Sequence, residues 1–170
     1  TGAGKTLQLA GLVGDSNVRR TGHVFTVEDP IAFVHRSQWW VVRYSAGCIH
    51  SRSFGAALRG ALREDPDFLL FGQMPGLATI ELALTAAETG HLVLSTLHTM
   101  DATETVNRII SVFPPHQQKQ IRLQLAAVLK AVVSLRLLPR ADGLGRVPAA
   151  EVLISTNYIR DCIENKEKTK

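Results

Sequence analysis

The first six residues, Thr1-Gly2-Ala3-Gly4-Lys5-Thr6, end in the Gly-Lys-Thr triplet of a phosphate-binding loop. In the full pattern, G-x-x-x-x-G-K-[ST], backbone N–H groups surround phosphates, the lysine reaches the β- and γ-phosphates, and the Ser/Thr hydroxyl binds Mg²⁺. The first glycine of this pattern would precede residue 1, so we expect the chain to begin inside the loop. The apolar segment 7–13 predicts a helix, whose N-terminus favours anions. Residues 1–6 therefore predict a nucleotide site, with Thr6 as its Mg²⁺ ligand.

Strand-like and helix-like segments alternate after this loop, which is typical of an α/β sheet with crossover helices. The sequence predicts strands at 23–27, 39–44, 68–71, 91–97 and 147–154, and helices at 53–62, 79–89, 102–112, 121–138 and 156–164. Segment 39–44 is also compatible with an edge hairpin formed with the residues before it. Segment 121–138 is assigned to one long helix because its apolar residues recur at helical spacing, at Ile121, Leu125, Leu129, Val132 and Leu135. We expect an α/β P-loop NTPase fold of the RecA-like type, with a mostly parallel sheet flanked by helices.

The length of 170 residues suits one domain with a core of its own, which we assign to residues 1–164. The polar tail 165–170 is expected to be frayed. The two cysteines, Cys48 and Cys162, lie far apart and favour a reducing cytoplasm over a disulfide framework. The longest apolar stretch, 123–138, is interrupted by polar and charged residues, so it predicts a core helix and not a membrane span.

Polar residues follow three of the predicted strands at the point where each strand ends. They are Glu28-Asp29, Gly72-Gln73 and Leu97-His98-Thr99. Open α/β sheets bind ligands at the carboxyl ends of their strands, and phosphate loops need an acidic partner that holds Mg²⁺ or activates water. The sequence therefore predicts that these three segments meet near Lys5.

Four sequence blocks carry a resemblance to a known family. They read TVEDPIAFVH, ALREDPDFLLFGQM, LTAAETGHLVLSTLHT and GRVPAAEVLI, in this order. Together they resemble the ATPase domain of type IV pilus retraction motors and, more widely, the type II and type IV secretion ATPases. The four-cysteine insert common in the assembly and secretion branch does not occur in this sequence, which favours the retraction branch.

The resemblance implies an ATPase that uses ATP and Mg²⁺ to power pilus retraction and twitching motility. It implies a homo-hexameric ring, a smaller domain ahead of this one, and a cytoplasmic location at the inner face of the bacterial inner membrane. Membrane association would come through partners, namely the pilus platform protein, and no nucleic acid is expected.

The family's residue roles carry over to five residues and one segment of this sequence. Lys5 and Thr6 would bind phosphates and Mg²⁺. Glu28 and Asp29 match the Asp box, whose glutamate is implicated in hydrolysis. His98 matches the His box, which lines the nucleotide site and senses the γ-phosphate. The segment 157–166, NYIRDCIENK, resembles the C-terminal AIRxLI segment of the retraction branch.

The sequence departs from the family at the position that matters most for hydrolysis. Where the family has GEMRD, this chain has Gly72-Gln73-Met74-Pro75-Gly76. An amide can orient water but cannot accept its proton. Two alternatives stay open beside the retraction motor: an assembly or secretion ATPase of the same superfamily, which the resemblance allows, and a nucleotide-binding subunit with weak or no hydrolysis, which Gln73 suggests. Arg59 and Arg63 remain open as arginine fingers or as part of a solvated helix face.

Overall fold

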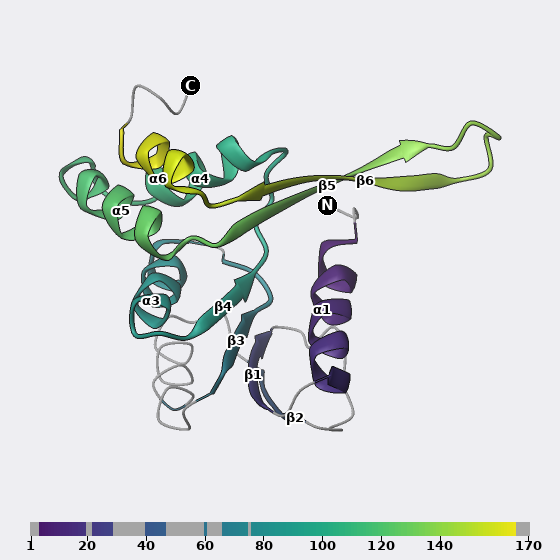
Figure 1. The fold of residues 1–170 in the computed structure, drawn as a ribbon, viewed down its shortest axis with the longest axis horizontal. Coiled ribbons are helices and arrows are strands. Elements are labelled where there is room, and N and C mark those ends of the chain that lie inside the picture. Colours follow the sequence, from purple (N-terminus) through teal and green to yellow (C-terminus); the bar gives the residue numbers. More distant parts are fainter. Residues whose placement is uncertain are drawn as a thin grey trace. The chain divides into compact units, whose positions relative to one another are not determined.

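The computed structural model describes residues 4–19, 22–28, 40–46, 60, 66–74 and 76–165, and for residues 6, 16–19, 22, 27–28 and 40–46 the description covers the backbone alone. The chain divides into two compact units (Figure 1). Residues 5–97 form one unit, and residues 1–4 with 98–170 form the other. The predicted helix 53–62 lies outside the described residues except for Gly60, and so does the tail from residue 166.

The unit of residues 5–97 is built on a four-stranded sheet with the strand order β2-β1-β3-β4. Its strands are β1 (Gly22–Glu28), β2 (Trp40–Ala46), β3 (Phe68–Phe71) and β4 (Leu92–Ser95). All three neighbouring pairs are parallel, which confirms the predicted α/β class. The alternative that made residues 39–44 part of a hairpin with the residues directly before them stays a prediction, because residues 29–39 lie outside the described part of the chain. β2 pairs in parallel with β1 from Gly22↔Trp40 to Glu28↔Ala46, and parallel neighbours need a crossover connection.

Two helices, α1 (Lys5–Arg19) and α3 (Leu77–Glu88), cover opposite faces of this sheet (Figure 1). Alternate residues of a strand point to opposite faces. Leu70 packs in one cluster with Val13 of α1, whereas Leu69 and Phe71 pack in another with Ala83 and Ala86 of α3. β3 is therefore buried on both faces, as its wholly apolar sequence predicts.

The other unit contains three helices and a two-stranded antiparallel sheet. The elements are α4 (Ala102–Ser111), α5 (Pro115–Val128), β5 (Ala131–Pro139), β6 (Arg146–Ile154) and α6 (Asn157–Glu164). Asp101 caps α4, because its carboxylate accepts a 2.7 Å bond from the N–H of Glu104. The Glu104 carboxylate accepts a 2.6 Å bond from the N–H of Met100 in return, so the two bonds resemble a capping box that is closed on the residue before the cap.

The prediction of one long helix over 121–138 is wrong. α5 ends at Val128, Leu129 is extended with φ −61° and ψ 128°, and residues 131–139 form β5. The apolar residues of this stretch fit both the spacing of a helix and the alternation of a strand. Ile121 and Leu125 follow the helical spacing, whereas Val133, Leu135 and Leu137 alternate as strand residues do. The β-branched pair Val132-Val133 favours the strand.

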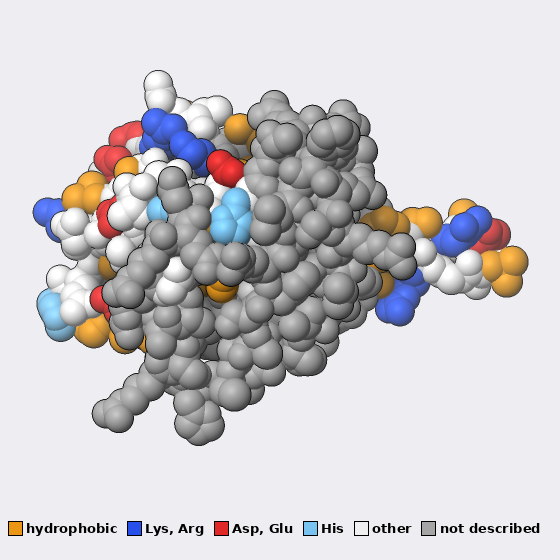
Figure 2. Space-filling view, turned by 90° about the horizontal axis from the view of Figure 1, so that it is seen from below, with side chains coloured by type: hydrophobic (Ala, Val, Ile, Leu, Met, Phe, Trp, Pro, Cys, Tyr) orange, Lys and Arg blue, Asp and Glu red, His pale blue; other side chains and the backbone are white. Residues whose placement is uncertain are grey.

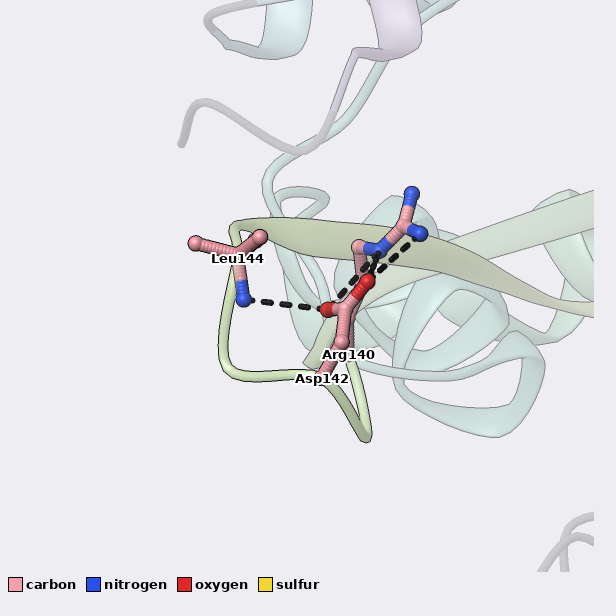
Figure 3. A network of polar contacts seen from close by, with 3 residues as sticks. All are labelled: Arg140, Asp142 and Leu144. Atoms are coloured by element: carbon pink, nitrogen blue, oxygen red, sulfur yellow. Dashed lines mark hydrogen bonds and ion pairs between the residues drawn. The ribbon is translucent and has the colours of Figure 1, made fainter.

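β5 and β6 form a hairpin that extends well beyond the helices of its own unit (Figure 1). At its tip, Arg140 donates three hydrogen bonds of 2.7–3.1 Å to the carboxylate of Asp142, and Asp142 accepts another of 3.0 Å from the N–H of Leu144 (Figure 3). These contacts lower the pKa of Asp142 from its ordinary 3.8, chiefly through the guanidinium of Arg140. Gly143 and Gly145, in the turn between the two strands, adopt positive φ.

One face of the hairpin is apolar over most of its length and ends in the pair Pro139↔Arg146 near the tip. Its other members are Ala131, Val133, Leu135, Leu137, Pro148, Ala150, Val152 and Ile154. Within the chain this face is largely exposed: Val152 and Ile154 are 58% and 59% exposed. Figure 2 shows hydrophobic side chains along the hairpin and charged side chains near its tip. Among the described residues, no helix is both long enough and apolar enough to cross a membrane.

Candidate functional site at the ends of parallel strands

The carboxyl ends of β1, β3 and β4 meet at one edge of the parallel sheet. The register pairs Val27 with Phe71 and Phe71 with Ser95, and these residues are at or next to the last position of their strands. The backbone therefore brings Glu28, Gly72-Gln73 and Thr96-Leu97 to one sheet edge, as the sequence predicts. Ligands of open α/β sheets bind outside this edge.

Lys5 lies at the same edge. It is the first residue of α1, and its ammonium donates a 2.7 Å hydrogen bond to the carbonyl oxygen of Leu97, just beyond the end of β4. Gly4 precedes it with a φ of 87°, a conformation that residues with a Cβ rarely adopt. A Cβ built on Gly4 would meet no atom within 4 Å, so the requirement for glycine comes from the backbone and not from crowding.

These features fit a phosphate group. A cationic side chain and the first N–H groups of a helix stand together, and both favour negative charge. A left-handed glycine directly before a helix turns successive N–H groups toward one side, which is the arrangement of an anion-binding nest. The described part of the loop thus has the donors that the sequence motif requires.

The segment after β3 carries Gln73, which is exposed at this edge. Its two neighbours are both bonded to Thr96: the Thr96 hydroxyl donates a short bond of 2.5 Å to the carbonyl of Gly72, and the Thr96 carbonyl accepts a 3.4 Å bond from the N–H of Met74. Gln73 is thus held from both sides by one residue of the neighbouring strand. Sequence reasoning did not find this role of Thr96, although a threonine directly after an apolar strand at a ligand edge is a usable signal.

His98 directly follows Leu97 in the chain and belongs to the other unit, where it is exposed. The residues after it are tied to α4 and β5. The Thr99 and Thr105 hydroxyls lie 2.7 Å apart, and the Met100 carbonyl accepts two 3.4 Å bonds from the guanidinium of Arg136. The backbone next to His98 is therefore fixed by bonds within this unit.

Several predicted site residues are outside what the structure describes. These are Thr1, Gly2, Ala3 and Asp29, the side chains of Thr6 and Glu28, and the arginines Arg59 and Arg63. Their roles remain predictions from the sequence. Lys5, Gln73 and the backbone position of Glu28 are the predicted elements that the structure brings to one edge.

Comparison with known proteins gives concordant matches over the whole chain. The sequence profile of the family described as "Type II/IV secretion system protein" matches residues 1–169. A "Twitching motility protein" of Neisseria gonorrhoeae is 47% identical over 167 residues, which is 98% of this chain and 45% of that protein. The type IV pilus retraction ATPase PilT of Pseudomonas aeruginosa is 45% identical over 163 residues, which is 96% of this chain and 47% of that protein.

Comparison of the fold with solved structures finds relatives of the same kind as the sequence comparison. A crystal structure described as the pilus retraction motor PilT with bound ADP superposes with a TM-score of 0.90 and 43% sequence identity. The superposition covers 98% of this chain and 48% of that one. The chain therefore spans about half the length of the relatives that it matches.

Proposed function

The chain belongs to the family of type II/IV secretion system proteins, and from this premise we propose that it is the ATP-hydrolysing domain of a type IV pilus retraction motor. The observation that supports the proposal most is the position of Lys5. Its ammonium stands beside the end of β4, at the edge where Gln73 and the backbone of Glu28 also lie. The names of the relatives from N. gonorrhoeae and P. aeruginosa support the retraction branch.

We assign the residues as follows. Residues 1–6 bind the phosphates of ATP, with Lys5 supplying the positive charge. Gln73 orients the attacking water by hydrogen bonding, because its amide cannot take up the proton. Glu28 and Asp29 form the acidic segment at the same edge, and without a glutamate at position 73 Glu28 takes up the proton inefficiently, so slow turnover is expected. His98 contacts the γ-phosphate, a role that its position directly after Leu97 supports.

Mg²⁺ fits this assignment through Thr6, which stands one residue after Lys5 at the start of α1. When bound, the ion would neutralise charge on the phosphate oxygens during transfer. The wider proposal is a homo-hexameric ring in the cytoplasm that acts on a platform protein at the inner face of the inner membrane.

Nucleotide binding and steady-state hydrolysis, measured on the full-length protein beside a Gln73→Glu variant, test this function. We expect ATP to bind to both. Turnover should be slow with Gln73 and should rise about 10²–10⁴-fold with glutamate, the usual contribution of a general base. Lys5→Ala is the control, because it removes the phosphate contact and should abolish binding.

Three results would change the proposal. Failure of the unmodified protein to bind ATP would overturn it. Brisk turnover with no gain from Gln73→Glu would assign water activation to Glu28, which Glu28→Gln then tests. Binding with no turnover in the natural protein, restored by glutamate, would favour the second candidate that Gln73 suggests, a nucleotide-binding subunit without strong hydrolysis. Loss of pilus retraction in cells that lack the protein, followed with fluorescently labelled pili, separates retraction from assembly.

A further inference from the structure

The end of β4 makes three polar contacts with the two loops that carry the chemistry. The Thr96 hydroxyl bonds the carbonyl of Gly72 at 2.5 Å, and the Thr96 carbonyl receives the N–H of Met74 at 3.4 Å. The next carbonyl, that of Leu97, receives the ammonium of Lys5 at 2.7 Å. Two consecutive residues of one strand end therefore touch both the phosphate loop and the segment of Gln73.

We propose that the Thr96 hydroxyl is a positioning group for hydrolysis, which fixes Gln73 relative to Lys5; this inference rests on the function proposed above. Gln73 itself is exposed, so burial does not hold it in place. Its backbone is held on either side by Thr96, across 24 residues of sequence. A water-orienting amide loses efficiency with small displacements, so the bonds that fix its backbone should control the rate of the chemical step.

The hydroxyl contributes something that the strand pairing does not supply. The paired register of β3 and β4 ends at Phe71↔Ser95, one position before Gly72 and Thr96. Beyond that point the strands are no longer paired, and the Thr96 hydroxyl instead donates a hydrogen bond to the carbonyl of Gly72, the residue directly before Gln73. Because the hydroxyl is partly buried, water competes with this bond less than at an open surface.

Two variants of Thr96 separate the hydroxyl from the shape of the side chain. Thr96→Val keeps the β-branched shape and the backbone bond to Met74 but removes the hydroxyl, whereas Thr96→Ser keeps the hydroxyl. Thr85→Val is the matched control, because the Thr85 hydroxyl bonds the carbonyl of Glu81 at 2.9 Å on the exposed side of α3. All three are made in the full-length protein, in the natural background and in the Gln73→Glu background.

We expect Thr96→Val to lower kcat about three- to ten-fold, the loss of one hydrogen bond, while the Kd for nucleotide changes less than about two-fold. Thr96→Ser should retain most of the rate, and Thr85→Val should leave it unchanged. Hydrogen–deuterium exchange of the peptide that contains Gly72–Met74 should be faster in Thr96→Val than in Thr96→Ser.

An unchanged kcat for Thr96→Val in a background that hydrolyses ATP would overturn the inference. So would equal losses in the valine and serine variants, or a slower rate with unaltered exchange of the Gly72–Met74 peptide. If neither background hydrolyses ATP, the proposed function fails by itself. The exchange rate then still decides whether Thr96 holds the Gln73 segment.

Discussion

The two sheets that the structure describes differ in the burial of their apolar residues. In the parallel sheet, β3 is enclosed: Leu69 and Phe71 are fully buried beneath α3, and Leu70 is buried beneath α1. In the β5–β6 hairpin, a largely apolar face that includes Val152 and Ile154 is left exposed within the chain. Lys5, Gln73 and Thr96 lie at the ends of the strands of this sheet, whose two faces are covered by α1 and α3.

The polar contacts of the parallel strand ends and of the hairpin tip differ in how far apart their partners lie in the sequence. At the strand ends, Lys5 reaches Leu97 across 92 residues of sequence, and Thr96 reaches Gly72 across 24. At the hairpin tip, Arg140 and Asp142 are two residues apart. The site therefore exists only once the parallel sheet has formed, whereas the tip contacts follow from local sequence. This difference predicts which substitutions disturb the whole fold and which disturb one turn.

The largest expected effect is that of Leu69→Ala. The side chain is fully buried, so its truncation should lower the free energy of unfolding by about 2–5 kcal/mol through lost burial and a cavity. The matched substitution on the hairpin, Val152→Ala, should cost under about 1 kcal/mol, because the valine is 58% exposed. Urea unfolding followed by circular dichroism measures both.

A loss of unfolding free energy for Val152→Ala as large as that for Leu69→Ala would contradict the contrast between a buried strand and an exposed hairpin face. It would mean that the apolar face of the hairpin is covered in the assembled protein, so that its exposure within one chain does not describe its surroundings in solution. Repeating the measurement over a range of protein concentrations identifies that case, because a cost that arises at an interface between copies changes with concentration.

An intermediate effect is expected at the start of α4. Asp101→Ala removes the cap of this helix and should cost about 1 kcal/mol of stability, whereas Asp101→Asn should retain most of it, since asparagine caps equally well. The cap is local in sequence like the hairpin tip, but it fixes the backbone that follows His98. Thermal unfolding gives the cost. Equal losses in the alanine and asparagine variants would mean that the charge matters and the cap does not.

The sequence was sufficient to predict the strand ends because several independent signals agree there. β3 is a short apolar run and β1 is rich in β-branched and aromatic residues, both are followed by polar residues, and a parallel arrangement brings such ends to one edge. The cap at Asp101 was predictable for a similar reason, since a capping residue must directly precede its helix. The position of Thr96 directly after an apolar strand was a signal for a polar role, but its partner was not predictable, because whether its hydroxyl meets the carbonyl of Gly72 depends on the register between β3 and β4.

The hairpin could not be predicted from periodicity because its sequence supports two structures. From Ile121 to Leu135 the apolar residues fit one helical stripe, and no glycine or proline marks the change after Val128. The decision between helix and strand there comes from pairing with β6, twenty or so residues later, in the register Ala131↔Ile154 to Pro139↔Arg146. Tertiary pairing outweighs local propensity in such a segment.

The smallest expected effect is at the hairpin tip. The pKa of Asp142 is below its ordinary 3.8, mainly because the Arg140 guanidinium favours the charged carboxylate. A lowered folded pKa means that the stabilisation is fully present above the unfolded value and is lost as the pH falls through the folded value. Both side chains are about half exposed, so the effect on stability is small.

The contact at the hairpin tip is better tested by measuring the Asp142 pKa itself, by NMR of carboxyl-labelled protein. In Arg140→Ala this pKa should rise toward 3.8, and Arg146→Ala, on the same hairpin, should leave it nearly unchanged. An unaltered pKa in Arg140→Ala would assign the shift to the N–H of Leu144 instead, and the tip would then owe its order to the turn backbone rather than to the ion pair.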